Sequence, residues 1–331
     1  MNQSFFPHYD LSTNQLQTCQ SLVCSPITQY QIEVMTSIQK SLVRIEKDTF
    51  KVFADKKETK FSQECGAFFE MLPTLAQLYC SFDAWLDFNP YMQVIFEELS
   101  NPMHQQLLNR NYSFLSKEYF VNTVHRFKFA LTQKKCALKL SKRKTLIKEQ
   151  ANLQKKYCSR LLSKQQELNC FLVELPLFLD SGLLNQESAI SYEKDTVKLM
   201  KEYFQNIHAA QVFNQKLCDI QWRIVKSIHG NLIGQALIYM LGTEAEVECE
   251  PELKKLWINT TQNRIANYSS IGEPSIASST IYMGNGIALK AWKKKLDLLH
   301  AHLEFFSYKA NGICFKWKNY TGNFNTLKTE G

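Results

Sequence analysis

The sequence lacks the short motifs that mark several common classes of enzyme. Its ten cysteines include no C-x-x-C pair, so we expect neither a zinc ribbon nor a redox-active dithiol. We predict instead that the cysteines are reduced and pack inside the protein. The chain also has no glycine-rich phosphate loop and no Ser-His-Asp pattern, which argues against nucleotide hydrolysis and serine-based catalysis.

The sequence also shows no segment that would direct the chain into or across a membrane. Residues 1–6 have neither the basic nor the apolar region of a signal peptide. The longest apolar stretches, at 170–179 and 232–241, are too short to span a bilayer and are interrupted by Glu174 and Gln235. We therefore expect a soluble, cytoplasmic protein that has no membrane partner.

What the sequence does have is one concentrated block of positive charge. Between Lys134 and Lys164 lie eleven Lys or Arg residues and one acid, Glu149, which is a net charge of +10. The whole protein carries +8, so the rest of the chain sums to −2. Such a block indicates a polyanionic partner, nucleic acid before membrane, although a solvated Lys-rich helix face would give the same pattern.

This basic block is predicted to be helical from Thr145 onward. Leu153, Tyr157 and Leu161 recur at helical spacing and should dock on the body of the protein, so that the cations form a ridge beside them. The more polar segment 139–148 is expected to be a mobile arm. The side chains that we expect to contact phosphates, for affinity and positioning and not for base reading, are Lys142, Arg143, Lys144, Lys155, Lys156, Arg160 and Lys164.

The N-terminal part of the chain is predicted to be a helical domain. Polar-residue–proline pairs at 25–26, 89–90 and 101–102 each place an N-cap residue before a proline suited to the first helical position. A second helix is expected at 68–79, interrupted or started by Pro73. The stripe typical of a core-facing helix is formed by Met35, Ile38, Leu42 and Ile45.

Beyond Cys170 the periodicity becomes that of short strands and helices in alternation. The predicted strands are 170–178, 220–229, 232–241 and 279–283, and the helices between them are 192–204 and 251–257. Gly230-Asn231 is the turn of the clearest hairpin. The final helix is predicted from the apolar stripe Leu289, Trp292, Leu296, Leu299, Leu303 and Phe306.

These elements predict an α+β protein. The order β-α-β-β-α-β followed by an extra terminal helix is the split βαβ, or ferredoxin-like, arrangement. The expected parts are a helical N-terminal domain at 1–133, a basic connecting helix at 134–168, a ferredoxin-like domain at 169–315 and a tail at 316–331.

Several short segments in this order carry a resemblance to a known family. They are the strand Phe171–Leu175, the hairpin strand Gly234–Met240, the pair Leu256-Trp257, the Gly284/Gly286 turn and the helix expected to end at Tyr308-Lys309. Over 157–315 the chain resembles inovirus-type replication proteins with a YagK/YfjJ C-terminal domain. These are relatives of the HUH rolling-circle initiators found on bacterial prophages and plasmids. The resemblance implies a DNA partner, either single-stranded or origin DNA.

The resemblance also implies a nicking centre, of which this chain has only parts. In such initiators two histidines on one strand bind a divalent metal beside the scissile phosphate, and a tyrosine attacks the phosphorus. The corresponding positions here are Gln235 and Leu237, and leucine cannot bind a metal. The remaining candidate ligands are His229 and Glu174, and the candidate nucleophile is Tyr308 on the expected terminal helix. We therefore expect no cofactor, or Mg²⁺ or Mn²⁺ only if the centre survives.

Two other pairs of side chains have competing interpretations. His300 and His302 lie about 200° apart on a helix, so they should not share a metal, and one should be exposed while the other packs. Tyr239 and Tyr282 would stack bases if their sheet face were open, but core packing is favoured for both.

The sequence as a whole predicts a DNA-binding, replication-initiator-like protein of a prophage or plasmid with a degraded nicking centre. The alternative is a noncatalytic interaction protein whose basic helix binds an acidic partner protein. Salt dependence would be seen with either partner, whereas competition by plain DNA would distinguish them.

Overall fold

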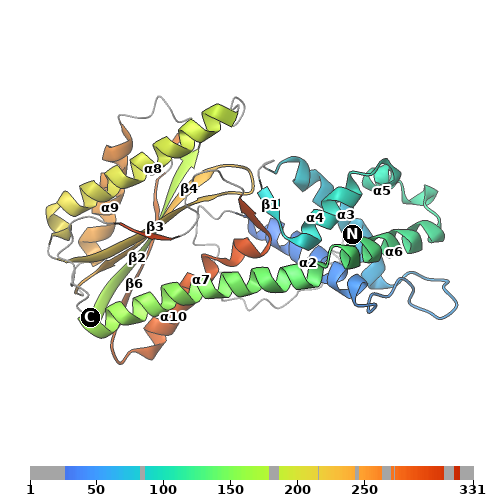
Figure 1. Cartoon of the computed structure of the whole chain (residues 1–331), viewed down its shortest axis with the longest axis horizontal. Coiled ribbons are helices and arrows are strands. Elements are labelled where there is room, and N and C mark those ends of the chain that lie inside the picture. Colours follow the sequence, from blue (N-terminus) through green and yellow to red (C-terminus); the bar gives the residue numbers. More distant parts are fainter. Residues whose placement is uncertain are drawn as a thin grey trace, which may run out of the picture.

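A helical bundle lies at one end of the computed structural model and a helix-covered antiparallel sheet at the other (Figure 1). This mixture of helices and antiparallel strands confirms the expected α+β class. Among the described residues, no helix combines the length and the apolar character needed to cross a bilayer. The structure describes residues 27–82, 86–178, 186–214, 216–242, 246–262, 270–271, 273–308 and 317–320.

The bundle consists of helices and 3₁₀ turns, most of which begin at polar caps. Its elements are α2 (Gln29–Glu46), α3 (Gln63–Cys80), β1 (Leu86–Phe88), α4 (Pro90–Leu99), η1 (Pro102–His104), α5 (Gln105–Leu108), η2 (Tyr112–Phe114) and α6 (Lys117–Gln133). The predicted cap at Asn89 is confirmed, because its side chain accepts a hydrogen bond from the Met92 amide at 2.9 Å. Asn101 caps only the 3₁₀ turn η1, and Pro73 lies inside α3 without ending it. The pair at 25–26 lies outside the described residues.

The core of the bundle contains the predicted stripe of α2 and also residues from the far end of the chain. Met35, Ile38 and Leu42 are fully buried. Phe305 and Phe306 pack into the same cluster from the other end of the sequence. Strand β7 (Phe306–Tyr308) pairs antiparallel with β1, so the bundle is completed by a segment more than 200 residues away.

The sheet unit follows the predicted alternation of strands and helices. Its elements are β2 (Glu167–Phe178), α8 (Gln186–Ala209), η4 (Gln211–Phe213), β3 (Leu217–Lys226), β4 (Leu232–Met240), α9 (Glu246–Gln262), β5 (Ser270–Ile271), β6 (Ser275–Tyr282), α10 (Gly286–Leu298), η6 (Ala301–Glu304) and β8 (Lys318–Asn319). The main strands lie side by side in the order β6-β2-β4-β3, and each is antiparallel to its neighbours. The short strand β8 adds to the outer edge of β3, and β5 pairs with the end of β2.

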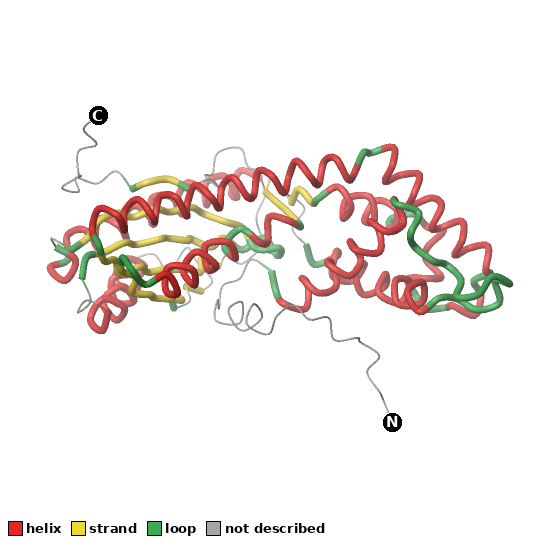
Figure 2. Tube along the Cα trace, turned by 90° about the horizontal axis from the view of Figure 1, so that it is seen from below, coloured by secondary structure: helices red, strands yellow, loops and turns green. Residues whose placement is uncertain are grey.

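The sheet is covered by helices on both faces, as Figures 1 and 2 show. Helices α8 and α9 pack on the face that carries Phe171 and Trp222. The long helix α7 (Cys136–Gln165) and α10 pack on the face that carries Leu172 and Leu237. Helix α7 runs without interruption from the bundle to the far side of the sheet, so it connects the two units.

Several predicted elements are corrected by the structure. Segment 139–148 is not an arm but part of α7, since Leu140 is buried against the bundle. The terminal helix ends at Leu298 instead of continuing to Phe306, because the carbonyl of Leu299 accepts a hydrogen bond from buried Arg223 and the chain then turns through η6 into β7. Leu303 is consequently only half-buried.

Candidate nucleic-acid interface

Helix α7 is anchored at both ends and exposes its outer face between them. Its 30 residues make a rod of about 45 Å. Cys136 and Leu140 are buried in the bundle core, and Cys158 and Leu162 are buried against the sheet. Both anchors lie on one face of the helix, and the opposite face therefore points away from the protein.

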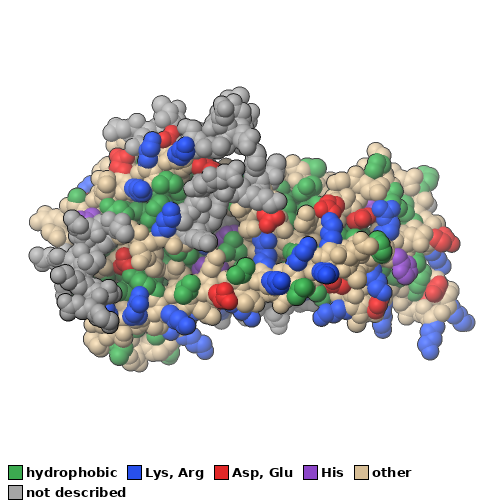
Figure 3. Space-filling view, in the orientation of Figure 1, with side chains coloured by type: hydrophobic (Ala, Val, Ile, Leu, Met, Phe, Trp, Pro, Cys, Tyr) green, Lys and Arg blue, Asp and Glu red, His purple; other side chains and the backbone are tan. Residues whose placement is uncertain are grey.

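Four of the predicted phosphate-contacting side chains lie on this outer face. Lys142, Lys156, Arg160 and Lys164 are exposed, and in the described part of the chain no carboxylate forms an ion pair with any of them. The last three follow one another at intervals of four residues, or about 6 Å along the helix. Figure 3 shows Lys and Arg side chains along the ridge that α7 makes in Figure 1.

Two more of the predicted cations form ion pairs with acids of the same protein. Nζ of Lys144 lies 2.7 Å from Oε1 of Glu304, and Nζ of Lys155 lies 2.5 Å from Oδ1 of Asp297. These pairs attach α7 to η6 and α10. Lys144 and Lys155 therefore have an intramolecular role and are weaker candidates for phosphate contact.

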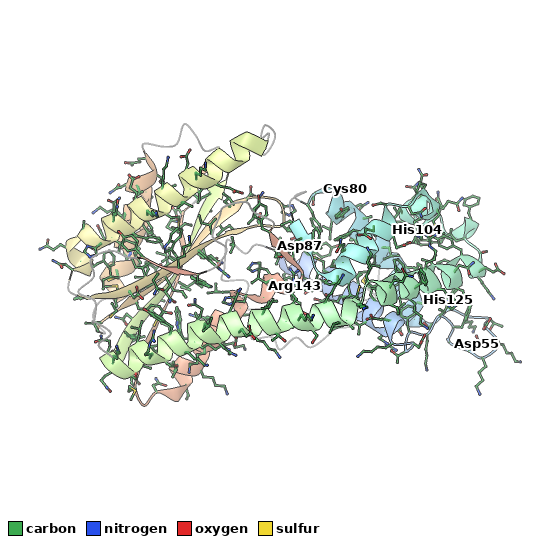
Figure 4. All side chains as sticks on the ribbon, in the orientation of Figure 1. Asp55, Cys80, Asp87, His104, His125 and Arg143 are labelled. Carbon is green, nitrogen blue, oxygen red and sulfur yellow. The ribbon has the colours of Figure 1, made fainter. Side chains whose placement is uncertain are left out.

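The interpretation of Arg143 as a phosphate ligand is corrected by the structure. Its Nε donates to the carbonyl of Leu303 at 2.6 Å, and its Nη2 to the carbonyl of Asp87 at 3.5 Å. Burial lowers the pKa of this guanidinium from its ordinary value, an effect that Asp87 and Glu304 partly oppose. Arg143 thus points inward, to the junction of bundle and sheet where Figure 4 labels it beside Asp87.

The position expected for a nicking centre is filled by a chain of buried polar groups. Nε of Arg223 donates to Oε1 of Gln235 at 2.8 Å, and Nε2 of Gln235 donates to Oε1 of Glu174 at 2.7 Å. These residues stand opposite one another on β3, β4 and β2, so their side chains share one face of the sheet. Leu237, on the same face, is part of the apolar cluster under α7 and α10.

Arg223 holds this chain of polar groups against the elements above the sheet. Its Nη2 donates to the carbonyl of Leu299 at 2.5 Å, and its guanidinium lies 4.7 Å from the ring centre of Trp317. Burial lowers the pKa of Arg223 to about 9, and the Glu174 carboxylate partly opposes that shift. The guanidinium therefore remains charged near neutral pH, and Glu174 serves as its buried counter-charge.

The two candidate metal ligands belong to different parts of the structure. His229 is exposed beyond β3, where Nε2 lies 2.9 Å from Nε2 of Gln31 and Nδ1 lies 3.1 Å from the carbonyl oxygen of Ser81. Glu174 is buried in the middle of the sheet. Among the described residues, no group of three or more His, Cys, Asp or Glu side chains could hold a metal ion.

Tyr308 lies on strand β7 and not on a terminal helix, which corrects the prediction. Its phenol donates to Oε1 of Glu193 at 2.9 Å and accepts from Nζ of Lys226 at 3.2 Å. Nothing in the local sequence predicted these partners, because Glu193 and Lys226 come from α8 and β3. The signal that could have revealed Arg223 was an arginine between the apolar residues Trp222 and Ile224 in the middle of a predicted strand.

Both histidines near the end of α10 are buried, whereas one was expected at the surface. Nε1 of Trp317 donates to Nε2 of His300 at 3.1 Å, so Nδ1 of His300 carries the proton that reaches the carbonyl of Leu296 at 2.9 Å. The pKa of His300 is lowered to about 4. Burial is the larger cause, and the positive charge of Arg223 is the next largest. The same two causes lower the pKa of His302 well below its ordinary value.

Comparison with known proteins gave no matching family model, curated protein or solved structure. The arrangement of side chains therefore has to indicate the function by itself. It offers a row of exposed cations for binding a polyanion, and a sheet face whose polar groups bind one another.

Proposed function

We propose that the protein binds DNA as a replication-initiator-like protein of a prophage or plasmid. The observation that carries this proposal is the row of Lys156, Arg160 and Lys164 on the outer face of α7, each exposed and without an acidic partner in the described chain. A regular row of cations on a rigid helix attracts a polyanion and releases its counterions. These side chains would position DNA, single-stranded or at an origin, without reading its bases.

The order of the strands supports the same proposal. Along the chain the sheet unit reads β-α-β-β-α-β, and in space the strands lie in the order β6-β2-β4-β3. This order supports a ferredoxin-like domain with α10 as the additional helix. Such a domain is the one implied by the resemblance to inovirus-type replication proteins with a YagK/YfjJ C-terminal domain.

We further propose that the nicking centre has been lost. Gln235, at one of the two expected histidine positions, is engaged by Arg223 and Glu174. Leu237, at the other, has no group that binds a metal and is fully buried. Binding would then need no Mg²⁺ or Mn²⁺, and the protein would act by holding DNA in place.

A second candidate function has one observation in its favour. Leu138, Leu146 and Leu153 lie on the outer side of α7 and are exposed by 54%, 60% and 66%. Leucines among cations on one helix face are typical of a surface that binds an acidic amphipathic helix. An acidic partner protein is therefore the alternative to DNA, and plain DNA would fail to compete with it.

The experiment that tests the proposed function is a salt titration of DNA binding by fluorescence anisotropy. If the four exposed cations predicted to contact phosphates, Lys142, Lys156, Arg160 and Lys164, each meet one, log K should fall against log salt with a slope of roughly −4 on duplex and roughly −3 on single strands. The triple variant Lys156→Gln, Arg160→Gln, Lys164→Gln should reduce the duplex slope by roughly 3.

A matched control removes the same number of positive charges from the bundle. Lys56, Lys57 and Lys60 are exposed on the loop between α2 and α3. Figure 4 labels Asp55 of this loop at the end of the bundle away from α7. The variant Lys56→Gln, Lys57→Gln, Lys60→Gln should leave the slope unchanged. If both triple variants change the slope equally, or if the full-length protein binds no DNA, the proposal is wrong.

A further inference from the structure

Among the described residues of the sheet unit, the most exposed apolar side chains lie at the turn between β6 and α10. Tyr282, Met283 and Ile287 are exposed by 48%, 52% and 84%. They lie within six residues of one another at one end of the molecule. We refer to these three residues as the apolar tip. A contiguous apolar group held out in water marks a contact site for another molecule.

The apolar tip is held rigidly by hydrogen bonds on both sides. The amide of Met283 donates to the carbonyl of Gln166, at the end of α7, at 2.7 Å. The side chain of Asn285 caps α10 by accepting from the amide of Ala288 at 3.1 Å. Gly284, with a φ of +95°, makes the short turn between them. The exposure of the tip is therefore fixed by the backbone.

Cations of α10 lie on the same side as the tip. Ile287, Lys290 and Lys294 are spaced by three and four residues, so they share one face of the helix. All three are exposed, whereas Trp292 and Leu296 on the opposite face are buried. The apolar residue of the first turn is thus followed by two positive charges along the outer side of α10.

The C-terminal end of α7 supplies more cations beside the tip. Lys155 pairs with Asp297, and the carbonyl of Gln166 binds the amide of Met283, so the two helices run antiparallel. This register places Lys164 level with the first turn of α10 along the helix axis, with its side chain on the outer face of α7. Figure 3 shows Lys and Arg side chains around hydrophobic ones at this end, in the lower left of the view.

We propose that the apolar tip is a wedge that enters DNA between bases, at the point where double strands become single. This inference rests on the proposed DNA-binding function. It specifies that the DNA contains a junction between double and single strands. Met and Ile side chains can insert between base steps, and the ring of Tyr282 can stack on an unpaired base. Arg160 and Lys164 hold the phosphates on one side of the wedge, and Lys290 and Lys294 hold them on the other.

The shape of the cationic surface favours DNA over an anionic membrane. The exposed cations Lys142, Lys156, Arg160 and Lys164 lie on one helix over about 33 Å, which is about one turn of duplex, and the last three form a continuous row at its end. The apolar tip lies at one end of this row, so that a duplex along α7 would meet the wedge where the row stops. A membrane, in contrast, would contact a flat ring of charges around the tip.

The experiment compares a short duplex with a forked DNA of the same sequence, using the full-length protein. The fork carries 2-aminopurine at the last base pair before the unpaired arms. The protein should bind the fork about tenfold more tightly than the duplex, as expected when one base gains a stacking contact. Fluorescence of 2-aminopurine should rise on binding, because this base loses its stacking neighbour.

The variant Tyr282→Ser, Met283→Ser, Ile287→Ser should lose both the preference for the fork and the rise in fluorescence, with its salt slope unchanged. The control Ile258→Ser changes an apolar residue of α9 that is 43% exposed and remote from the tip, and it should behave as the unmodified protein. Circular dichroism of each variant checks that the fold is retained.

Three other results would overturn the wedge. Equal affinity for fork and duplex rejects it but leaves the DNA-binding function intact, whereas no binding to either DNA rejects both. In a third assay the protein is sedimented with vesicles of phosphatidylcholine and phosphatidylserine. If the tip variant loses vesicle binding while its fork preference is unchanged, the tip is a membrane contact.

Discussion

The phenol of Tyr308 donates a hydrogen bond to the carboxylate of Glu193, with 2.9 Å between the two oxygens. The ammonium group of Lys226 lies 4.3 Å from the centre of the same ring and donates to the same phenol oxygen. Tyr308 therefore joins β7 of the bundle to α8 and β3 of the sheet unit. In this position Tyr308 stabilises the contact between the bundle and the sheet unit. This role differs from that of the nucleophile expected from the sequence.

The first prediction follows from this position of Tyr308. Tyr308→Phe should lower the free energy of unfolding by about 1–3 kcal/mol, because it leaves a charged carboxylate without its phenol donor. Neither the unmodified protein nor the variant should nick DNA or form a covalent adduct on a denaturing gel with Mg²⁺ or Mn²⁺. An adduct that disappears in Tyr308→Phe would instead show that the protein is an enzyme.

The second prediction separates two neighbouring cations of α7. Arg143→Ala should destabilise the protein in urea unfolding by about 1–3 kcal/mol, since the half-buried carbonyls of Leu303 and Asp87 lose their donor. It should leave the salt slope of DNA binding unchanged. Lys142→Ala should do the reverse, with a shallower slope and unchanged stability. Identical behaviour of the two variants would contradict the inward orientation of Arg143.

The third prediction concerns the buried charges on the sheet. Arg223→Leu should cost about 3–5 kcal/mol, because it leaves the carboxylate of Glu174 buried without its counter-charge. Adding Glu174→Leu should recover part of that loss, so the two costs should not add. Urea unfolding of the single and double variants measures the coupling. Strictly additive costs would mean that the two charges do not interact.

The fourth prediction compares two leucines near the chain's last helix. Leu296 is 1% exposed between α10 and the sheet, so Leu296→Ala should cost about 2–5 kcal/mol. Leu303 is half-buried in η6, and Leu303→Ala should cost clearly less. Thermal or urea unfolding provides the comparison. Equal losses would indicate that the helix continues through η6 as the sequence pattern suggested.

The fifth prediction concerns pH. Burial lowers the pKa of His300 from 6.5 to about 4, so the unfolded chain takes up this proton first as pH falls. Stability should therefore decrease between about pH 6.5 and pH 4. Burial raises the pKa of Asp219 from 3.8 to about 6, which acts in the opposite direction because the folded state binds that proton first.

Unfolding midpoints in urea at several pH values test these signs. His300→Gln should flatten the decrease in stability towards low pH, and Asp219→Asn should make the decrease steeper. His302, whose pKa is also lowered by burial, remains in both variants and keeps part of the effect. A midpoint that rises as the solution is acidified would show that Asp219 outweighs the histidines.

Local patterns predicted much of the sheet unit correctly. The turn at Gly230-Asn231 and the apolar runs on either side of it gave the hairpin, which the structure has between Lys226 and Leu232. Such signals are local, because a turn and its flanking strands lie within a few residues of one another. The stripe of α2 was predicted for the same reason, since residues three and four apart lie on one helix face.

The features that the sequence did not reveal depend on contacts between distant segments. Strand β7 has only three residues and forms by pairing with β1. Because β1 is distant in the sequence, the residues of β7 could not be distinguished locally from the end of a helix. Charge counting likewise could not distinguish Arg143 from Lys142, because the carbonyls that bind Arg143 come from β1 and η6. The resemblance to replication initiators stays a prediction.

The pairing of β1 with β7 has a consequence for how the protein is made. On the ribosome, residues 27–140 emerge long before Phe305 and Phe306, which belong to the same apolar cluster. Until then the bundle has an unfilled core and an unpaired strand edge at Leu86–Phe88, both of which favour aggregation. A nascent chain of this protein should therefore depend on chaperones for most of its synthesis, and expression of the bundle alone should give an insoluble product.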